Sequence, residues 1–348
     1  MRSRSSGDKE LSALTPQAPA EELAEHHRAR SIGTGSAHAK AILLGEHAVV
    51  YGAPALALPM KQLTVTASAG WSHRTADGRY GVLFTMTGSA SRPLATEASG
   101  SLGRLAGEVK AFLGVSGGPN LDVIVDCAIP PGRGLGSSAA CARAIVFALA
   151  DLFGRELSQS DAFALVQTAE SVAHGRASGV DAQAVGASAP LLFQGGQVRE
   201  LPIGCDGLFI VADSGDTGRT KDAVGLLRSA FEQNAGAREK FVRRSRELTD
   251  AGRRALAEGR SERLGTCLTD NHELLRAAGL STGRIDALVE AALAAGSLGA
   301  KMTGGGLGGC LIALTRMDQA REVTQRLHRA GAAHTWAVPL KGSSRHAR

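Results

Sequence analysis

A glycine-rich segment, Ile129–Ala140, has the composition of an anion-binding loop. Its alternating Gly132, Gly134 and Gly136 permit positive φ angles, which turn backbone N–H groups toward one point. The helix expected after them adds the positive end of its dipole and unpaired N–H groups. Ser137 and Ser138 can cap that helix and also offer hydroxyl oxygens to Mg²⁺. The segment predicts a phosphate site, although a glycine-rich turn with a serine cap explains it equally simply.

The spacing of these glycines excludes two common phosphate-binding motifs. No Gly-Lys-Ser/Thr follows them, so the segment is not a Walker loop, and the third glycine follows the second too closely for a dinucleotide G-x-G-x-x-G. A second glycine-rich run, Lys301–Cys310, costs chain entropy, which indicates close backbone approach to another segment. This run either lies against the first loop or is only a connector.

Two further segments carry charged groups. In His38–Gly52, Lys40 is expected on a strand, with Glu46 and His47 in the turn beyond it. In the fourth segment, Glu170 is expected on a helix and Asp181 follows a Ser-Gly turn. A helix acid with a loop acid suits one metal ligand and one base. Each residue taken singly is also explained as an ordinary surface or turn residue.

The elements that would position these residues mix strands and helices without regular βαβ alternation, which indicates the α+β class. Apolar patterning predicts strands over residues 36–44, 63–68, 82–86, 121–126, 190–193, 208–212, 310–314 and 334–339. It predicts helices over residues 102–113, 137–153, 160–174, 219–235, 238–258, 261–277, 283–296 and 317–331, with Ser160 capping the third.

The length of 348 residues predicts two domains. A glycine- and proline-rich shift in composition near residues 194–206 divides them. We therefore expect a flexible N-terminal extension over 1–30, an N-terminal domain over 31–198, a C-terminal domain over 199–341 and a tail over 342–348.

Composition also excludes several classes of protein. With 43% hydrophobic residues the chain is not wholly disordered, and no apolar run reaches the roughly 18–20 residues of a membrane span. The five cysteines are too widely spaced for a metal site or a dense disulfide framework. Since no signal peptide is visible, we expect a cytoplasmic protein without membrane contact.

The net charge of +6 is concentrated in two stretches. Residues 236–266 hold nine Lys/Arg against five Asp/Glu, and residues 316–348 hold seven against two. Acids interleaved with the bases of the first stretch favour a solvated helix face over a nucleic-acid surface, so we expect no nucleic-acid partner.

Taken together and in this order, the four segments resemble the signatures of the GHMP kinases, the superfamily of galactokinase, homoserine, mevalonate and phosphomevalonate kinases. Pro130–Ala140 matches the central P-x-x-x-G-L-G-S-S-A-A loop, and Lys301–Cys310 matches the late K-x-T-G-x-G-x-G-G-C loop. The turn Gly45–Gly52 resembles that of the mevalonate kinases, since galactokinases continue Gly-Glu-His with Thr-Asp-Tyr and phosphomevalonate kinases typically read Gly-Glu-Tyr. The resemblance covers about residues 34–315.

This resemblance implies a two-domain GHMP kinase fold, with an N-terminal half like a ribosomal S5 domain 2 and a ferredoxin-like C-terminal half. It implies ATP and Mg²⁺ as cofactors and mevalonate as acceptor, phosphorylated on its C5 hydroxyl in the mevalonate pathway of isoprenoid precursor synthesis. It also makes a homodimer plausible. Competing readings are another GHMP kinase, such as phosphomevalonate kinase, or a silent relative that binds ATP without turnover.

The same resemblance implies roles for individual residues. Asp181 would be the base and Lys40 would lie near both Asp181 and the γ-phosphate. Ser137 or Ser138 would hold Mg²⁺ together with Glu170. The loop that wraps the phosphates would comprise Pro131, Gly132, Arg133, Gly134, Leu135, Gly136, Ser137 and Ser138. The substrate pocket would comprise Glu46, His47, Ser178, Asp181 and Gly304.

One departure concerns the approach to Asp181. Many relatives read Asn-Pro-Ser-Gly-x-Asp where this chain reads Arg176-Ala177-Ser178-Gly179-Val180-Asp181. The Ser-Gly-x-Asp end is retained, so the departure affects the entry of the loop and not the expected base.

Overall fold

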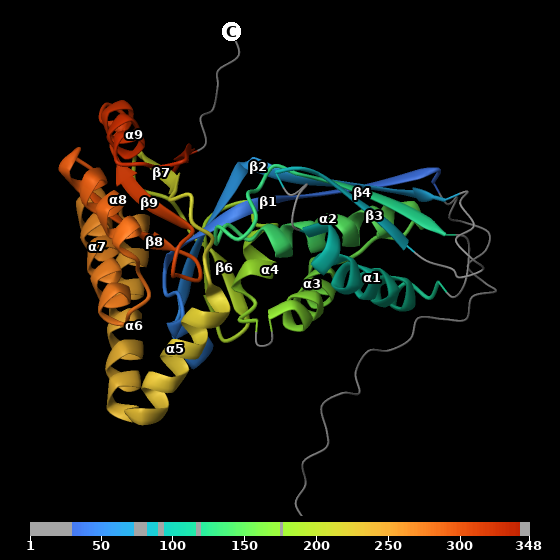
Figure 1. Cartoon of the computed structure of the whole chain (residues 1–348), viewed down its shortest axis with the longest axis horizontal. Coiled ribbons are helices and arrows are strands. Elements are labelled where there is room, and N and C mark those ends of the chain that lie inside the picture. Colours follow the sequence, from blue (N-terminus) through green and yellow to red (C-terminus); the bar gives the residue numbers. More distant parts are fainter. Residues whose placement is uncertain (1–29, 73–81, 90–93, 116–119, 175–176, 342–348) are drawn as a thin grey trace, which may run out of the picture.

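The computed structural model describes residues 30–72, 82–89, 94–115, 120–174 and 177–341. These residues form a six-stranded and a four-stranded sheet side by side, each covered by helices (Figure 1). The architecture is the α+β arrangement expected from the sequence. The predicted extension and tail lie outside the described residues, except for Arg30.

The first sheet has the strand order β3-β4-β2-β5-β6, and β1 pairs with β2. Its strands are β1 Ile32–Leu44, β2 Ala55–Trp71, β3 Val82–Gly88, β4 Leu121–Cys127, β5 Leu191–Gln194 and β6 Gln197–Glu200. The long β2 pairs antiparallel with β1 along one edge and with β5 and then β4 along the other. This central strand joins the segment that carries Lys40 to the rest of the domain.

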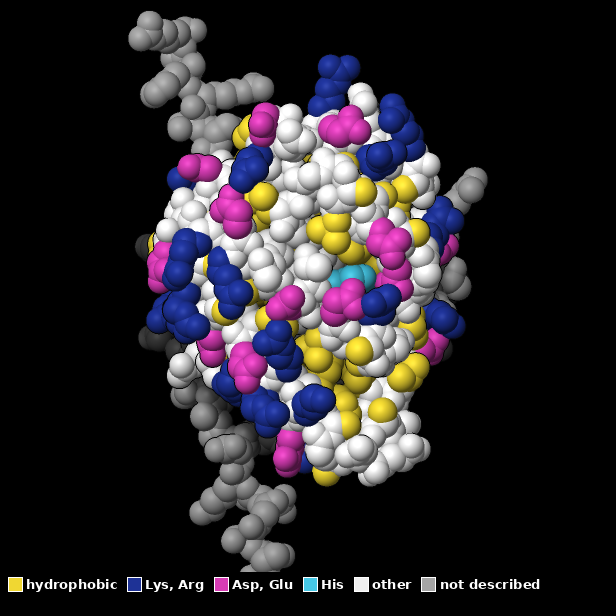
Figure 2. Space-filling view, turned by 90° about the vertical axis from the view of Figure 1, so that its left-hand side faces the viewer, with side chains coloured by type: hydrophobic (Ala, Val, Ile, Leu, Met, Phe, Trp, Pro, Cys, Tyr) yellow, Lys and Arg dark blue, Asp and Glu magenta, His cyan; other side chains and the backbone are white. Residues whose placement is uncertain are grey.

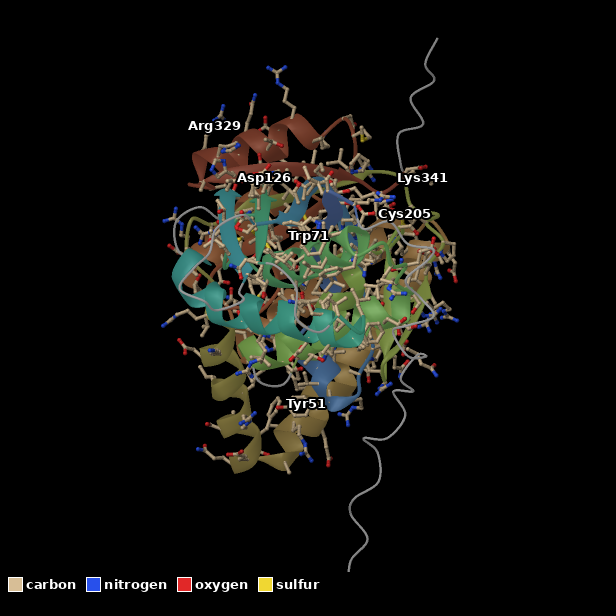
Figure 3. The ribbon with its side chains drawn as sticks, turned by 90° about the vertical axis from the view of Figure 1, so that its right-hand side faces the viewer. Tyr51, Trp71, Asp126, Cys205, Arg329 and Lys341 are labelled. Carbon is tan, nitrogen blue, oxygen red and sulfur yellow. The ribbon has the colours of Figure 1, made fainter. Side chains whose placement is uncertain are left out.

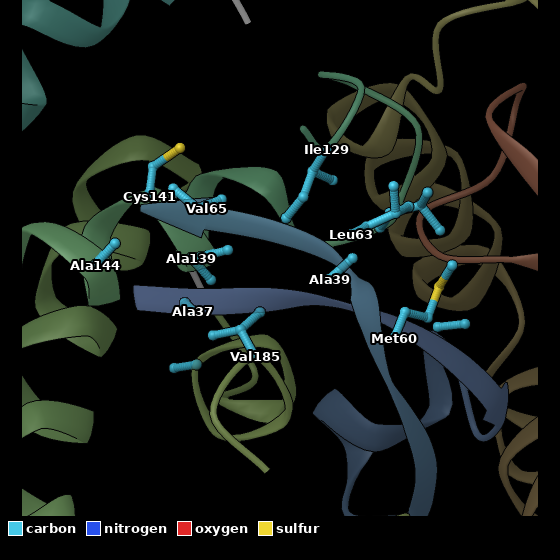
Figure 4. Close-up of a cluster of buried hydrophobic side chains, with 14 of the residues drawn as sticks. Ala37, Ala39, Met60, Leu63, Val65, Ile129, Ala139, Cys141, Ala144 and Val185 are labelled. Carbon is cyan, nitrogen blue, oxygen red and sulfur yellow. The ribbon is translucent and has the colours of Figure 1, made fainter. Parts of the chain in front are cut away.

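Two helices pack on the first sheet, α1 Leu94–Phe112 and α2 Ser137–Leu152, and α3 Gln159–His174 packs against both of them. The approach of α2 to β1 depends on small residues: a Cβ on Gly35 would lie 2.1 Å from the carbonyl oxygen of Ala144. Ala37 of β1 and Ala139 of α2 belong to the same buried cluster (Figure 4). This close packing brings the start of α2, and the loop before it, to the level of Lys40 on β1.

The second sheet is antiparallel, with the order β10-β7-β9-β8. Its strands are β7 Leu208–Asp213, β8 Gly299–Thr303, β9 Cys310–Thr315 and β10 His334–Pro339. Counted along the chain these strands run 4-1-3-2, the ferredoxin-like order that the resemblance implied. Helices α8 Gly283–Ala294 and α9 Ala320–Arg329 cover one face.

The other face of the second sheet is covered by the first half of the molecule together with two long helices. These are α6 Ala235–Ala257 and α7 Ser261–Ala277, and α5 Thr220–Gln233 precedes them. Phe209 and Val211 of β7 share one continuous core with Leu256 of α6 and with Ala39 of β1. The two halves are therefore packed against each other through apolar side chains.

The predicted domain division at residue 198 falls inside β6, which still pairs with β5 in the first sheet. The chain crosses to the second sheet within residues 201–207, before β7 begins. Leu201 and Cys205 of this crossing are buried in the shared core.

Several elements differ from the sequence prediction. The structure adds β6, β8, the short helix α4 Val180–Ala184 and the 3₁₀ turn η1 Ala48–Tyr51. Ser160 is not the cap of α3, because the backbone N–H of Asp161 donates to Ser158 Oγ at 3.1 Å. Ser137 and Ser138 do not cap α2 either, since Gly136 occupies the N-cap position with φ 76°.

The basic stretch 236–266 forms most of α6 and the start of α7, where bases and acids alternate on the surface (Figure 2). Arg244 pairs with Asp270 at 2.9 Å and with Glu247 at 3.6 Å. This pairing is typical of a solvated helix face. Within the described ranges, the helices are all too short or too polar to span a membrane.

Candidate active site

A cleft of about 410 Å³ lies between the two halves of the molecule. It gathers residues from all four segments that the sequence singled out. The predicted site residues that line it are Lys40, Glu46, His47, Gly134, Glu170, Ser178, Asp181 and Gly304. Elements far apart in the chain thus place the expected charged groups around one space.

The first glycine-rich loop precedes α2 and has the backbone geometry expected of an anion cradle. Gly132, Gly134 and Gly136 have φ angles of 67°, 75° and 76°. Its carbonyl oxygens are engaged: that of Gly132 accepts from Gly218 N, and that of Leu135 accepts from Lys40 N. Within the described part of the chain, the backbone N–H groups from Gly132 to Ser138 have no backbone acceptor. The loop therefore offers a row of free donors at a helix N-terminus.

The second glycine-rich run backs the first loop directly. A Cβ on Gly304 would lie 2.7 Å from Gly134 Cα, and one on Gly309 would lie 2.9 Å from the carbonyl oxygen of Arg133. Because the neighbouring atoms are backbone, neither loop can move aside to admit a side chain. The entropic cost of these glycines is thus offset by close contact between the loops.

The side chain of Arg133 does not enter the cleft. It forms an ion pair with Asp213 at 3.0 Å and donates to the carbonyl oxygen of Gly215 at 3.0 Å. Arg133 thus ties the phosphate loop to the end of β7 in the second sheet. Arg176 lies outside the described residues.

Lys40 and Asp181 form an ion pair at 3.0 Å. Lys40 is 2% exposed, whereas the Asp181 side chain is 41% exposed and lies at the start of α4. The Lys40 ammonium also donates to the carbonyl oxygen of Gly134 at 3.1 Å. One buried cation therefore connects an accessible carboxylate to the phosphate loop.

Ser138 and Glu170 meet on the other side of the loop. Ser138 Oγ donates to Glu170 Oε1 at 2.6 Å, and the Glu170 carboxylate is buried at the cleft wall. A hydroxyl and a carboxylate oxygen beside a phosphate cradle are the hard donors that Mg²⁺ prefers alongside phosphate and water. The donor set fits a magnesium ion. Of the two serines that the sequence offers, Ser138 is the one whose hydroxyl is seen in contact with Glu170.

Glu46 and His47 form the turn after β1, and both line the cleft. Glu46 Oε1 accepts from the ammonium of Lys301, a fully buried residue of β8. Burial raises the pKa of Glu46 and lowers the pKa of Lys301. His47 has a φ of 59°, and the backbone of Gly305 lies beside its side chain. Among the described residues, neither Glu46 Oε2 nor His47 Nε2 has a partner, although both atoms are buried.

Burial lowers the pKa of His47 to about 4. The unfolded chain, whose histidine has a pKa of about 6.5, then binds more protons than the folded chain between these values. We expect the free energy of unfolding to fall as pH falls from about 6.5 to about 4, with His47 contributing on the order of 3 kcal/mol. In His47→Asn the free energy of unfolding, measured by urea melts, should change less steeply with pH, because asparagine does not titrate. Asparagine is chosen because it tolerates a positive φ.

Replacement of the exposed His334 is the control for this measurement. His334→Asn should leave the slope of the wild type unchanged. Equal slopes in the wild type and His47→Asn would exclude a contribution from His47. The half-buried His38 and the buried His272 also have lowered pKa values, so part of the pH dependence remains in either variant.

Helix α5 contributes cleft residues that the sequence analysis did not identify. Lys221, Val224, Gly225 and Arg228 line the cleft at the spacing of one helix face. The side chains of Lys221 and Arg228 form no hydrogen bond or ion pair with other residues in the described ranges. Phe231 of the same helix packs edge to face on Tyr51 of η1 at 5.5 Å, which fixes α5 beside the Glu46 turn. Tyr51 is labelled in Figure 3. The helical spacing is readable in the sequence, but the direction of the face is not.

The chain matches two family models. The model of the GHMP kinases N terminal domain matches residues 102–188, and that of the GHMP kinases C terminal matches residues 253–333. Two similar proteins are both named mevalonate kinase. The one from Pyrococcus horikoshii is 32% identical and covers 85% of this chain and 92% of its own length. The one from Aeropyrum pernix is 32% identical and covers 90% and 98%.

Solved structures share the fold. The L. major mevalonate kinase in complex with R-mevalonate has a TM-score of 0.79 at 23% identity and covers 91% of this chain and 99% of its own. The Streptococcus pneumoniae phosphomevalonate kinase in complex with phosphomevalonate and AMPPNP has a TM-score of 0.73 at 18% identity, with coverage of 88% and 99%. With both halves matched and relatives at this identity over most of its length, the chain belongs to the mevalonate kinases of the GHMP kinase family.

Proposed function

We propose that this chain transfers the γ-phosphoryl group of ATP to the C5 hydroxyl of mevalonate, giving 5-phosphomevalonate and ADP. The observation that carries the proposal is the buried ammonium of Lys40, which contacts both Asp181 and the phosphate loop. This arrangement joins a carboxylate suited to an alcohol with a cradle suited to a phosphate. The names of the relatives supply the acceptor.

The chain's residues would divide the reaction between them. The free N–H groups of Gly132–Ser138 would hold the phosphates of ATP. Asp181 would accept a hydrogen bond from the C5 hydroxyl, whose oxygen forms the new bond to the γ-phosphorus as the bond to the ADP oxygen breaks. The hydroxyl proton would pass to Asp181. Lys40 would stabilise negative charge on the transferring group, and positioning supplies most of the catalysis.

Ser138 and Glu170 would hold Mg²⁺, with the pair already in hydrogen-bond contact. When bound with ATP, the ion supplies positive charge that neutralises the phosphate oxygens. The buried position of Glu170 keeps this carboxylate at the wall of the cleft. We propose Ser138 as the hydroxyl donor, because its Oγ contacts Glu170 Oε1.

Mevalonate carries a carboxylate at the end opposite its C5 hydroxyl, and α5 offers cations for it. Replacing Lys221 or Arg228 by alanine is expected to raise the KM for mevalonate about tenfold each, because a hydrogen bond to a charged group contributes roughly 1.5–3 kcal/mol. The KM for ATP should stay within about twofold. Steady-state kinetics with each substrate varied in turn would measure this difference.

Arg238→Ala is the matched control for this prediction. Arg238 is exposed on α6 and does not line the cleft, so its loss removes the same charge without removing a cleft contact. An equal rise in the KM for mevalonate in Arg238→Ala would show that the effect comes from the net positive charge of the protein and not from a contact in the cleft. Unchanged KM for mevalonate in both α5 variants would exclude the carboxylate assignment.

The same two cations favour phosphomevalonate kinase as a second candidate, because a phosphate-bearing acceptor needs additional Lys or Arg in its pocket. An ADP-release assay with Mg·ATP and separate mevalonate, phosphomevalonate, galactose and homoserine tests the two functions together. We expect turnover on mevalonate. Turnover on phosphomevalonate alone would show that the protein is a phosphomevalonate kinase. ATP binding without turnover on any acceptor would favour a relative that binds ATP but has no catalytic activity.

We further propose a cytoplasmic location. Its support is that all five cysteines are buried and free, as is typical of proteins in a reducing compartment. The homodimer expected from the family resemblance stays a prediction.

A further inference from the structure

The Glu46–His47 turn is held from the opposite half of the molecule. Lys301 lies in the middle of β8, in the second sheet, and its ammonium reaches Glu46 Oε1 across the boundary between the halves. Four residues after Lys301, the backbone of Gly305 lies beside the side chain of His47. The segment Lys301–Gly305, which also packs on the phosphate loop, therefore contacts both residues of the turn and holds Glu46 through the ammonium of Lys301.

The contacts of β8 explain why its lysine is directed at the turn. Lys301 and Thr303 alternate along the strand, so both side chains point to the same side, toward β1. Thr303 Oγ1 accepts from Ile42 N and donates to the carbonyl oxygen of Ile42, each at 2.9 Å. The Lys301 ammonium donates to the carbonyl oxygens of Met302 at 2.6 Å and of Ile42 at 3.5 Å. The bonds to Ile42 fix β8 against the end of β1, where the turn begins.

The charge of Glu46 needs this partner. A carboxylate taken out of water is costly unless it is paired and hydrogen-bonded, and the side chain of Glu46 is 2% exposed. Lys40 is the nearest alternative, but its ammonium contacts Asp181 and Gly134. Among the residues in the described ranges, Lys301 is the cation in hydrogen-bond contact with Glu46.

The pairing uses only half of the carboxylate. Oε1 of Glu46 accepts from Lys301, whereas Oε2 is buried and has no partner within the described structure. Glu46 lines the cleft, so a polyhydroxylated acceptor can supply the missing donor. A carboxylate that accepts from a hydroxyl must keep a fixed orientation, and an unpaired Glu46 would rotate or take up a proton.

We propose that Lys301 is a positioning residue for the phosphoryl acceptor: from the second half of the molecule it orients Glu46 so that Oε2 receives a hydroxyl of the acceptor. The inference rests on the proposed function, since it concerns the acceptor side of the same cleft. It gives the lysine of the late glycine-rich motif a role that the phosphate loop does not require.

The test compares Lys301→Met with Thr303→Val. Methionine retains the length and apolar stem of lysine without its charge, and valine removes the other β8–β1 contact without touching Glu46. For Lys301→Met we expect the KM for mevalonate to rise at least tenfold, with the KM for ATP within twofold of the wild type. For Thr303→Val we expect a lower melting temperature with both KM values within twofold. If both variants instead raise both KM values in proportion to their loss of melting temperature, Lys301 is only structural.

A comparison of two variants that lack the Glu46 carboxylate keeps the inference testable if Lys301→Met does not fold. The pair Glu46→Gln and Glu46→Gln/Lys301→Met removes the buried carboxylate in both members. If Lys301 acts through Glu46, the double variant should have the same KM for mevalonate as Glu46→Gln alone. A further tenfold rise in the double variant would contradict the inference.

Kinetics of the wild type distinguish a failure of the positioning role of Lys301 from a failure of the proposed function. Phosphorylation of mevalonate by the wild type, with an unchanged KM for mevalonate in Lys301→Met, would overturn the positioning role and leave the proposed function intact. Failure of the wild type to phosphorylate mevalonate would overturn both.

Discussion

Replacement of Asp181 by asparagine is expected to lower kcat about a thousandfold while ATP binding is retained. Loss of a positioned acid or base typically costs 10²–10⁴ in rate. Asparagine is nearly isosteric, and its carbonyl oxygen can still accept from Lys40, so the 3.0 Å contact and the fold should persist. The change removes only the ability to take the proton of the acceptor hydroxyl. A coupled ADP-release assay would measure kcat, and isothermal titration calorimetry would measure the binding of ATP.

The control for this variant is Asp206→Asn. Asp206 is an exposed aspartate that pairs with Lys341 far from the cleft, and its loss should leave kcat unchanged. Near-normal kcat in Asp181→Asn would remove this residue from the mechanism. Loss of ATP binding in the same variant would show that Asp181 supports the nucleotide site instead.

Lys40→Met is expected to lower kcat by roughly 10²–10³, the cost of removing one preorganised donor from a developing negative charge. The lysine stem packs beneath the phosphate loop: a Cβ on Gly136 would lie 3.0 Å from Lys40 Cε. Methionine retains most of this packing, so the melting temperature should fall less than the rate. The loss should appear in kcat, since the ammonium of Lys40 contacts Asp181 and the phosphate loop and is not in contact with Glu46 or His47.

Lys61→Met, at an exposed position of β2, is the matched control and should have wild-type kinetics. An unaffected rate in Lys40→Met would exclude Lys40 from charge stabilisation. An unfolded Lys40→Met would show that the buried ion pair is chiefly a folding contact.

The residues of the phosphate loop could be predicted from the sequence because they form a short, local motif. Alternating glycines before a helix predict the cradle, and the resemblance to the GHMP kinases implies that the charged residues of the four segments meet. The structure brings Lys40, Asp181 and the phosphate loop together as expected. The ferredoxin-like order of the second sheet followed from the family resemblance and is confirmed by the pairing of β7–β10.

Contacts that depend on distant partners were not predictable. Residues 299–303 form a fully buried strand. Their sequence does not predict it, because it contains a lysine and is flanked by glycines. The burial of Lys301 depends on its pairing with Glu46, which is far away in the sequence. The first half of β2 was missed because it is buried on both faces and contains Pro59, so it shows no alternation. The cleft-facing side of α5 depends on how two halves pack, which no local pattern records.

The measurement that tests the central claim most directly is the identification of the product made from Mg·ATP and mevalonate labelled with ¹³C at C5. The proposed function predicts one ADP for each product molecule and a C5 carbon signal split by coupling to phosphorus. Asp181→Asn at the same concentration should give almost none of this product. A phosphate on another atom of mevalonate, or ATP bound without any phosphorylated mevalonate, would contradict the proposed function.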